Sequence, residues 1–282
     1  MKAEEKTEAW GIREENKGKE SAMFTHTFAV CAYKDSPYLE TCIRSLKKQT
    51  VSSTIIVCTS TPSSYIKGIA EKYGLPYFVR EGKSDIQSDW NFAYEQAKSQ
   101  LVTIAHQDDY YHRDYARMVQ ECWQKYEDTT VFSTDCVIIK GRRLQRPGMF
   151  LWIKKLLRIP LRFRGLANHI CLKQAILLWG NPIICPSSTY NKEQLGMPLF
   201  ASPYKFALDW DTLWKLAKRP GRFVCVEKPL IGYRIHEEAT TKAFIDNHQR
   251  SKEELSMYQK IWPRPVARGL MVFYRKAYRA YQ

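Results

Sequence analysis

The chain has 282 residues, a formal net charge of +15 and a sequence pI near 9.4. Its content of 44% hydrophobic and 13% aromatic residues excludes a disordered chain and is enough for one large or two small globular domains. The positive charge predicts attraction to nucleic acid, anionic lipid or phosphorylated substrates, and it does not choose among them. No apolar run reaches the roughly 18 residues of a membrane-spanning helix, so no such helix is expected.

The cysteines and the N-terminus bear on the cellular compartment. Eight cysteines are scattered along the chain without a C-x-x-C pair, and most lie in apolar runs, where a free thiol behaves as a small hydrophobe. We therefore expect reduced thiols and a cytoplasmic protein. Residues 1–23 are rich in Glu and Lys and lack the apolar core of a signal peptide, so they are predicted to form an N-terminal tail.

Strand-like and helical patterns alternate from residue 24 to residue 139. The predicted strands are Thr27–Ala32, Thr54–Cys58, Tyr77–Arg80, Leu101–Ala105 and Val131–Val137. Helices are predicted to start at Ser36, at Thr61, and at Ser88 or Asp89, and a fourth carries Tyr115, Met118, Val119 and Cys122. This alternation predicts an α/β fold with a mostly parallel sheet covered by helices, whose ligands lie beyond the carboxyl ends of the strands.

The most informative stretch is Leu101–Tyr111, with the sequence LVTIAHQDDYY. A short buried strand ends there in Asp108 and Asp109, and two adjacent carboxylates are unfavourable at such a place unless a positive charge is close. A Mg²⁺ or Mn²⁺ ion that bridges a substrate diphosphate would supply that charge. The alternative is that the two aspartates only start a turn and cap the next helix. Neither a G-x-G-x-x-G nor a G-x-x-x-x-G-K-[ST] motif is present, so side chains and a metal would have to hold a nucleotide.

A basic segment follows the alternating region. No Asp or Glu occurs between Cys136 and Lys192, and Met149–Leu166 (MFLWIKKLLRIPLRFRGL) mixes bulky apolar and basic residues. This composition favours a segment that lies on an anionic membrane surface, broken into two pieces at Pro160. The alternative is a solvated basic loop whose apolar residues pack on the domain. Residues 260–282, which are basic and contain no acid, are predicted to form a basic amphipathic helix and a second membrane contact.

Two further acids and a histidine come late in the chain. Asp209 and Asp211 lie two positions apart at a predicted helix start, where the helix dipole alone would favour carboxylates. The functional alternative is that one of them is a general base. Strands are predicted at Arg222–Val226 and Leu230–Ile235, and the second strand delivers His236, a candidate for the shell of a metal held by the aspartates.

With these features in order, residues 24–240 resemble the family 2 glycosyltransferases of the GT-A fold. The resemblance rests on Phe28–Thr50 as the opening strand, polar loop and first helix, on HQDDYY as a D-x-D-type metal motif, on LDWDTLW as the acidic E-D motif, and on YRIH as the late Tyr-Arg-x-His element. Two departures affect what is implied. CTSTPSS (Cys58–Ser64) replaces the usual Asp-Asp-Gly-Ser, which leaves the base preference open, and Leu208 replaces the Glu before Asp209. The Q-x-x-R-W signature of processive synthases is absent, which indicates transfer of single sugars.

The resemblance assigns roles to individual residues. It implies that Ala32, Tyr33 and Asp35 line the nucleotide base pocket, Asp89 and Asn91 lie near the base and ribose, Asp108 faces the ribose, Asp109 binds a Mn²⁺ or Mg²⁺ ion that His236 also ligates, and Asp209 is the catalytic base, with Asp211 as the second candidate. It also implies a nucleotide-sugar half at 24–139, an acceptor half at 140–245 with the basic insertion at 140–175, and a C-terminal basic helical segment at 246–282.

The implied function is inverting, metal-dependent transfer of a single sugar from a nucleotide-sugar, with a UDP-sugar expected, to a hydroxyl of a glycan or polyprenyl-diphosphate-linked acceptor. Such an enzyme would serve cell-surface polysaccharide synthesis at the inner face of the cell membrane. A nucleic-acid-binding protein is the first alternative, but the basic residues do not surround an aromatic stacking sheet, and we expect no nucleic acid partner. The second, a sugar nucleotidyltransferase, would need a Gly-rich phosphate loop after the first strand, where the chain has YKDSPY.

Overall fold

The computed structural model describes residues 23–141, 143–145, 148–163, 165–236 and 249–276, so the predicted N-terminal tail lies outside the described residues except for Met23. In the described residues nine strands form one sheet: β1 (His26–Ala32), β2 (Thr54–Thr59), β3 (Tyr77–Val79), β4 (Leu101–His106), β5 (Tyr110–Tyr111), β6 (Thr129–Lys140), β7 (Arg143–Gln145), β8 (Thr189–Asn191) and β9 (Arg222–Ile235). The helices are α1 (Leu39–Leu46), α2 (Ser64–Lys72), α3 (Ile86–Gln96), α4 (Tyr115–Lys125), α5 (Met149–Leu157), α6 (Ile170–Ala175), α7 (Lys192–Leu195), α8 (Leu208–Ala217), α10 (Gln249–Ile261) and α11 (Arg264–Lys276), with short 3-10 helices η2 (Ile159–Arg162) and η3 (Cys185–Ser187).

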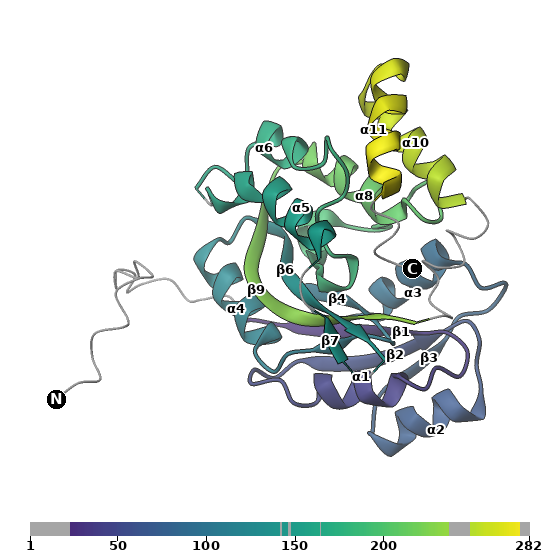
Figure 1. The fold of residues 1–282 in the computed structure, drawn as a ribbon. Helices are drawn as coiled ribbons and strands as arrows, with labels where there is room; N and C mark the ends of the chain where they lie inside the picture. Colours follow the sequence, from purple (N-terminus) through teal and green to yellow (C-terminus); the bar gives the residue numbers. More distant parts are fainter. Residues whose placement is uncertain (1–22, 142, 146–147, 164, 237–248, 277–282) are drawn as a thin grey trace, which may run out of the picture.

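The longest ladders of the sheet are parallel, which confirms the predicted α/β fold. The strand order is β3-β2-β1-β4-β8-β6-β9-β5, with β7 paired to β6. Strands β1, β2 and β4 run parallel, as do β6 and β9, while the short β8 runs antiparallel between β4 and β6. In Figure 1, α1 and α2 lie on one side of the sheet, and α5, α6 and α8 gather on the other side.

The carboxyl ends of three neighbouring strands meet at one edge of the sheet. Ala32 at the end of β1 pairs with Thr59 at the end of β2, and Cys31 pairs with His106 at the end of β4. The apolar strand interiors bury completely, as Phe28 illustrates with no exposed surface, because helices cover both faces. The polar loops that follow these strands, among them the one that carries the acid pair, therefore open into a shared space.

The N-caps of the first helices differ from the predicted ones. Ser36 does not cap α1, because the helix begins only at Leu39, after Tyr38. The Ser36 hydroxyl donates to Asp108 Oδ1 over 2.7 Å and accepts from the backbone N–H of Tyr38 over 3.3 Å. Ser63 rather than Thr61 caps α2, and Asp85 caps α3 upstream of the predicted start.

The basic segment folds into two short pieces, α5 and η2, as predicted, but the break lies at Arg158 and Pro160 is in the first turn of η2. Leu151 and Leu161 are buried, whereas Trp152 and Leu156 are exposed. The segment therefore has features of both alternatives, since part of its apolar surface packs on the domain and part does not. No helix in the described ranges is both long enough and apolar enough to cross a bilayer.

The end of the chain differs from the prediction in two respects. The two predicted strands after residue 221 are one continuous strand, β9, whose pairing with β6 shifts register on either side of Pro229. The helix predicted from Lys260 begins instead at Arg264, after a break at Pro263, and a separate helix, α10, precedes the break. Ala267 and Met271 of α11 are buried, and residues 277–282 lie outside the described part of the chain.

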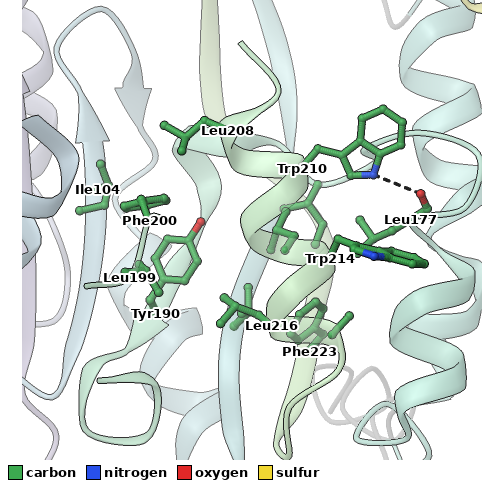
Figure 2. Close-up of a cluster of buried hydrophobic side chains, with 14 of the residues drawn as sticks. Ile104, Leu177, Tyr190, Leu199, Phe200, Leu208, Trp210, Trp214, Leu216 and Phe223 are labelled. Atoms are coloured by element: carbon green, nitrogen blue, oxygen red, sulfur yellow. Dashed lines mark hydrogen bonds between the residues drawn. The ribbon is translucent and has the colours of Figure 1, made fainter. Parts of the chain in front are cut away.

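Helix α8 is held on several sides by the core. Figure 2 shows its Trp210 and Trp214 packed among buried apolar side chains, and the indole N–H of Trp210 donates a hydrogen bond to the carbonyl oxygen of Leu177 over 3.1 Å. Trp210 and Leu213 are almost fully buried. Asp209 lies in the first turn of this helix. Because the helix is anchored in this way, the direction of the Asp209 side chain is fixed.

Candidate active site

A cavity of about 880 Å³ lies beyond the carboxyl ends of β1, β2 and β4. Asp109, His236 and Asp209 all line it, although they are far apart in the sequence. Five other predicted site residues also line it: Ala32, Tyr33, Asp35, Asp89 and Asp108. Asn91 and Asp211 are absent from the lining that the described residues provide. The cavity thus joins the acid pair to the first turn of α8 in one space, as a bisubstrate site requires.

The Asp109 carboxylate is buried at the end of the β4 strand. Its Oδ1 accepts a hydrogen bond from the backbone N–H of Arg234 over 2.8 Å, and its Oδ2 lies 4.0 Å from His106 Nδ1. Burial raises the pKa of Asp109 to about 8, and the neighbouring Asp108 adds to this effect. Burial lowers the pKa of His106 to about 4, so His106 is neutral near pH 7 and supplies no compensating charge. The backbone N–H and the charge of Arg234 oppose the effect of burial, and a bound cation would favour the ionised form of Asp109 further.

His236 stands beside the other member of the acid pair. Its Nε2 lies 3.3 Å from Asp108 Oδ2 without making a hydrogen bond, and no hydrogen-bond partner for this buried nitrogen occurs in the described residues. The ring of Tyr38 packs against the imidazole with centroids 5.1 Å apart. No group of three or more His, Cys, Asp and Glu side chains in the described ranges is arranged to hold a metal alone. The donor set fits a Mn²⁺ or Mg²⁺ ion that takes its other ligands from a diphosphate and water.

Gln107 holds the loop after β1 through two hydrogen bonds. The backbone N–H of Tyr33 donates to Gln107 Oε1 over 3.0 Å, and Gln107 Nε2 donates back to the carbonyl oxygen of Tyr33 over 2.8 Å. The next residue, Lys34, has a φ of +52°, in the left-handed region, which turns the loop along the rim of the cavity. The backbone of Tyr33 is thereby held beside Gln107, and its half-exposed side chain lines the cavity that the acid pair also lines.

Two predicted nucleotide-binding acids are held by neighbours from other loops. Asp35 Oδ1 accepts a hydrogen bond from the hydroxyl of Ser63 over 2.6 Å. Asp89 Oδ1 accepts one from Arg80 Nε over 2.7 Å, and two serine hydroxyls donate to its Oδ2 over 2.9 Å each. These contacts fix the loops after β2 and β3 around the same side of the cavity.

Asn91 and Asp211 have structural partners. Asn91 makes two hydrogen bonds with the backbone of Phe200, donating over 2.7 Å and accepting over 2.9 Å. Asp211 is fully buried, and its two oxygens pair with Lys215 over 2.7 Å and Lys260 over 2.5 Å. Neither side chain reaches the cavity, so the geometry does not support a role for Asn91 at the nucleotide or for Asp211 as the base.

Asp209 lies in a short network across the cavity from the acid pair. Its Oδ1 accepts from the backbone N–H of Trp210 over 2.7 Å and its Oδ2 from Asn181 Nδ2 over 2.8 Å. Lys154 of α5 donates to the carbonyl oxygen of the same Asn181 over 2.6 Å. Burial raises the pKa of Asp209, and the Lys154 ammonium opposes that effect, while burial lowers the pKa of Lys154 to about 8. A carboxylate with raised proton affinity that faces a cavity is suited to general base catalysis.

Several lining residues with specific contacts were not among the predicted ones, and four of them bear on the chemistry of the site. They are Gln107, Lys154, Asn181 and Arg234. Arg234 Nε donates to the backbone carbonyl oxygen of Asp108 over 2.9 Å. Because Arg234 lies within the YRIH element, this motif was a signal from which it could have been predicted. Lys154 belongs to the basic segment for which the sequence left a membrane surface and a solvated loop as alternatives, and only the packing of α5 turns this lysine inward.

Comparison with known proteins agrees with this geometry. The family model described as glycosyl transferase family 2 matches residues 27–179, which is more than half of the chain. No curated protein matches the chain.

Solved structures show the same fold at low sequence identity. TarS of S. aureus (residues 1–349), solved in complex with UDP-GlcNAc, is 14% identical, with a TM-score of 0.60 over 92% of this chain and 74% of that one. The mannosyltransferase PcManGT of Pyrobaculum calidifontis, in complex with GDP-Man and Mn²⁺, is 16% identical, with a TM-score of 0.57 over 94% and 79%. Glucosyl-3-phosphoglycerate synthase of Mycobacterium tuberculosis, with Mn²⁺ and UDP-glucose, is 13% identical, with a TM-score of 0.56 over 82% and 77%. In another TarS structure of the same residue range, the match spans 66% of that chain.

Proposed function

Since the chain belongs to glycosyl transferase family 2 and is therefore a glycosyltransferase, we propose that it transfers a single sugar from a UDP-sugar, with inversion, to a hydroxyl of a glycan or polyprenyl-diphosphate-linked acceptor. The observation that carries this proposal is the single cavity shared by Asp109, His236 and Asp209. This cavity offers an acid pair that would hold a cation for the donor diphosphate, and a separate carboxylate for the acceptor hydroxyl.

The donor would occupy the side of the cavity that adjoins the carboxyl ends of β1, β2 and β4. Tyr33 and Asp35 line this side, next to Asp89 and Asp108, and we assign the base and ribose to them. UDP is the preferred nucleotide in our proposal, because the similar structures include complexes with UDP-sugars, and GDP is the alternative that PcManGT binds. Asn91 is left out of this pocket because its amide is engaged by the Phe200 backbone.

Asp109 and His236 would hold a Mn²⁺ or Mg²⁺ ion, with Asp108 beside the imidazole. The fit rests on the buried Asp109 carboxylate and on the His236 nitrogen that lies 3.3 Å from Asp108 without a hydrogen bond. When bound, the cation would neutralise charge that develops on the departing diphosphate. Arg234 would contribute a second positive charge at the same place, because its guanidinium lies against Asp108 and over the Tyr38 ring.

Asp209 would act as the general base toward the acceptor. Its two oxygens each accept one hydrogen bond, from Trp210 and from Asn181, and this orients the carboxylate while leaving acceptor capacity for an acceptor hydroxyl in the cavity. Attack of that hydroxyl oxygen on the anomeric carbon forms the new glycosidic bond while the bond to the diphosphate oxygen breaks, and Asp209 takes the hydroxyl proton. Attack from the side opposite the leaving group inverts the anomeric centre.

We place this reaction in cell-surface polysaccharide synthesis at the inner, cytoplasmic face of the cell membrane. All eight cysteines are free thiols in the structure, which agrees with a reducing compartment. The net charge of +15 would attract the anionic membrane surface and an acceptor that carries a diphosphate.

A donor screen followed by product analysis tests the proposal. Thermal shifts of the full chain with UDP- and GDP-sugars, each with Mn²⁺ or EDTA, are expected to select a UDP-sugar only when Mn²⁺ is present. Proton NMR of the product should then give the anomeric configuration opposite to that of the donor. Stabilisation by GDP-sugars alone would overturn the donor assignment, and a retained configuration would overturn the mechanism.

A further inference from the structure

Helix α5 carries its apolar and basic residues on unexpected faces. Leu151, Lys154 and Arg158 follow helical spacing and point inward: Leu151 and Lys154 line the active-site cavity and Arg158 is buried. Trp152 and Leu156 lie one turn apart on the outer face, with 66% and 65% of their surface exposed. A surface helix of a globular protein normally has the opposite arrangement, with apolar residues inside and charges outside.

The inward cations of α5 are matched by partners inside the protein. Arg158 Nη2 lies 3.1 Å from Asp135 Oδ1, and Lys155 Nζ lies 2.9 Å from Asp135 Oδ2. Lys154 donates to the carbonyl oxygen of Asn181. The basic residues of this helix therefore bind partners inside the protein. They do not form the basic outer surface that the sequence suggested.

The exposed apolar surface continues beyond α5. Helix η2 packs against both α5 and α6, which makes the three elements one face, and Figure 1 shows α5 and α6 together above the sheet. Six large apolar side chains of this face are exposed: Trp152, Ile153, Leu156, Phe163, Leu166 and Ile170. We name these six residues the α5–α6 apolar face. A cluster of this kind indicates an interaction surface, since single exposed apolar residues are normal but a group is not.

We propose that the α5–α6 apolar face inserts into the headgroup region of an anionic phospholipid bilayer. Charge supports this occupant, because the sequence from Cys136 to Lys192 has no acid and the partly exposed Lys155 ammonium lies over the Trp152 ring, while Arg162 at the edge of the face pairs with Glu227 over 2.7 Å. A mixture of exposed Trp, Phe and aliphatic side chains suits the bilayer interface. Position supports it as well, since the inner side of α5 lines the cavity and a lipid-linked acceptor would enter from the membrane next to Asp209.

This inference gives a surface and a mechanism to the membrane location proposed above, but it does not depend on sugar transfer. The test is sedimentation of the full chain with vesicles of phosphatidylglycerol and phosphatidylcholine, without donor or metal. Failure of the enzyme assay and failure of vesicle binding are therefore separate results. The test variant is Trp152→Ser combined with Leu156→Ser, and the control is Val79→Ser, which removes an exposed apolar side chain from β3 in the nucleotide-sugar half.

We expect the wild type and the control to bind the anionic vesicles equally, and the double variant to bind roughly tenfold more weakly, since two of the inserting side chains are lost. Pure phosphatidylcholine vesicles should bind the wild type more weakly than anionic ones. The tryptophan emission of the wild type should shift to shorter wavelength on binding, and Trp152→Phe should bind but reduce that shift. Equal binding by the double variant would overturn the proposal, as would a Trp152-dependent dimer in place of vesicle binding.

Discussion

Replacement of Lys154 by methionine provides a sharp test of the base network. Methionine keeps most of the side-chain volume and removes the ammonium group that donates to the Asn181 carbonyl over 2.6 Å. The side-chain amide of Asn181 in turn donates to Asp209 over 2.8 Å, so the ammonium and the carboxylate are linked through the backbone and the side chain of one residue. Because the ammonium lowers the pKa of Asp209 against the effect of burial, its loss should raise that pKa.

The size of the shift follows from the separation of the two groups. A nearby opposite charge shifts the pKa of a carboxyl by about 1–3 units, and the connection through the Asn181 residue favours the low end, about one unit or about 1.4 kcal/mol. A general base works only when it is deprotonated, so kcat/KM falls as pH drops through the pKa of Asp209. In Lys154→Met this acid limb should move about one pH unit higher, which makes the variant about tenfold slower on the limb and little changed on the plateau.

The assay is a profile of kcat/KM from acid to alkaline pH for the wild type, Lys154→Met and Lys154→Arg. Arginine keeps the positive charge, so its acid limb should coincide with that of the wild type. A loss of activity by the same factor at every pH in Lys154→Met would refute the electrostatic role and leave only a packing role for Lys154.

Three other substitutions separate the catalytic residues from the structural ones. Asp209→Asn should lower kcat by about a thousandfold or more while donor affinity, measured by calorimetry, stays within about twofold, because only the base is lost. Asp211→Asn should leave the KM for the donor unchanged but lower the free energy of unfolding by about 2–3 kcal/mol in urea titrations, since two lysines lose a buried partner. Asn91→Ala should cost about 1–2 kcal/mol of stability with little change in donor affinity, and a selective loss of donor binding would return Asn91 to the nucleotide pocket.

The fold could be predicted from the sequence because its signals are local. Buried strands such as β4 appear as short apolar runs, and polar residues collect at their ends, where parallel strands share one edge. The acid pair could be located for the same reason, since Asp108 and Asp109 follow a strand directly.

The parts that could not be predicted depend on contacts between distant residues. Asn91 reads as a site residue, yet its partner is the backbone of Phe200, 109 positions away. Lys154 reads as a surface cation, and only the packing of α5 against the core turns it toward Asn181. In both cases the side chain is compatible with either role, and tertiary structure alone decides the direction in which it points.

The most direct test of the central claim is a calorimetric titration of the full chain with UDP, once with Mn²⁺ and once with EDTA. If Asp109 and His236 hold the cation that binds the diphosphate, Mn²⁺ should tighten UDP binding by about tenfold or more, or about 1.4 kcal/mol, and Asp109→Asn should remove that gain. Equal UDP affinity with Mn²⁺ and with EDTA would contradict a metal-held donor at this site.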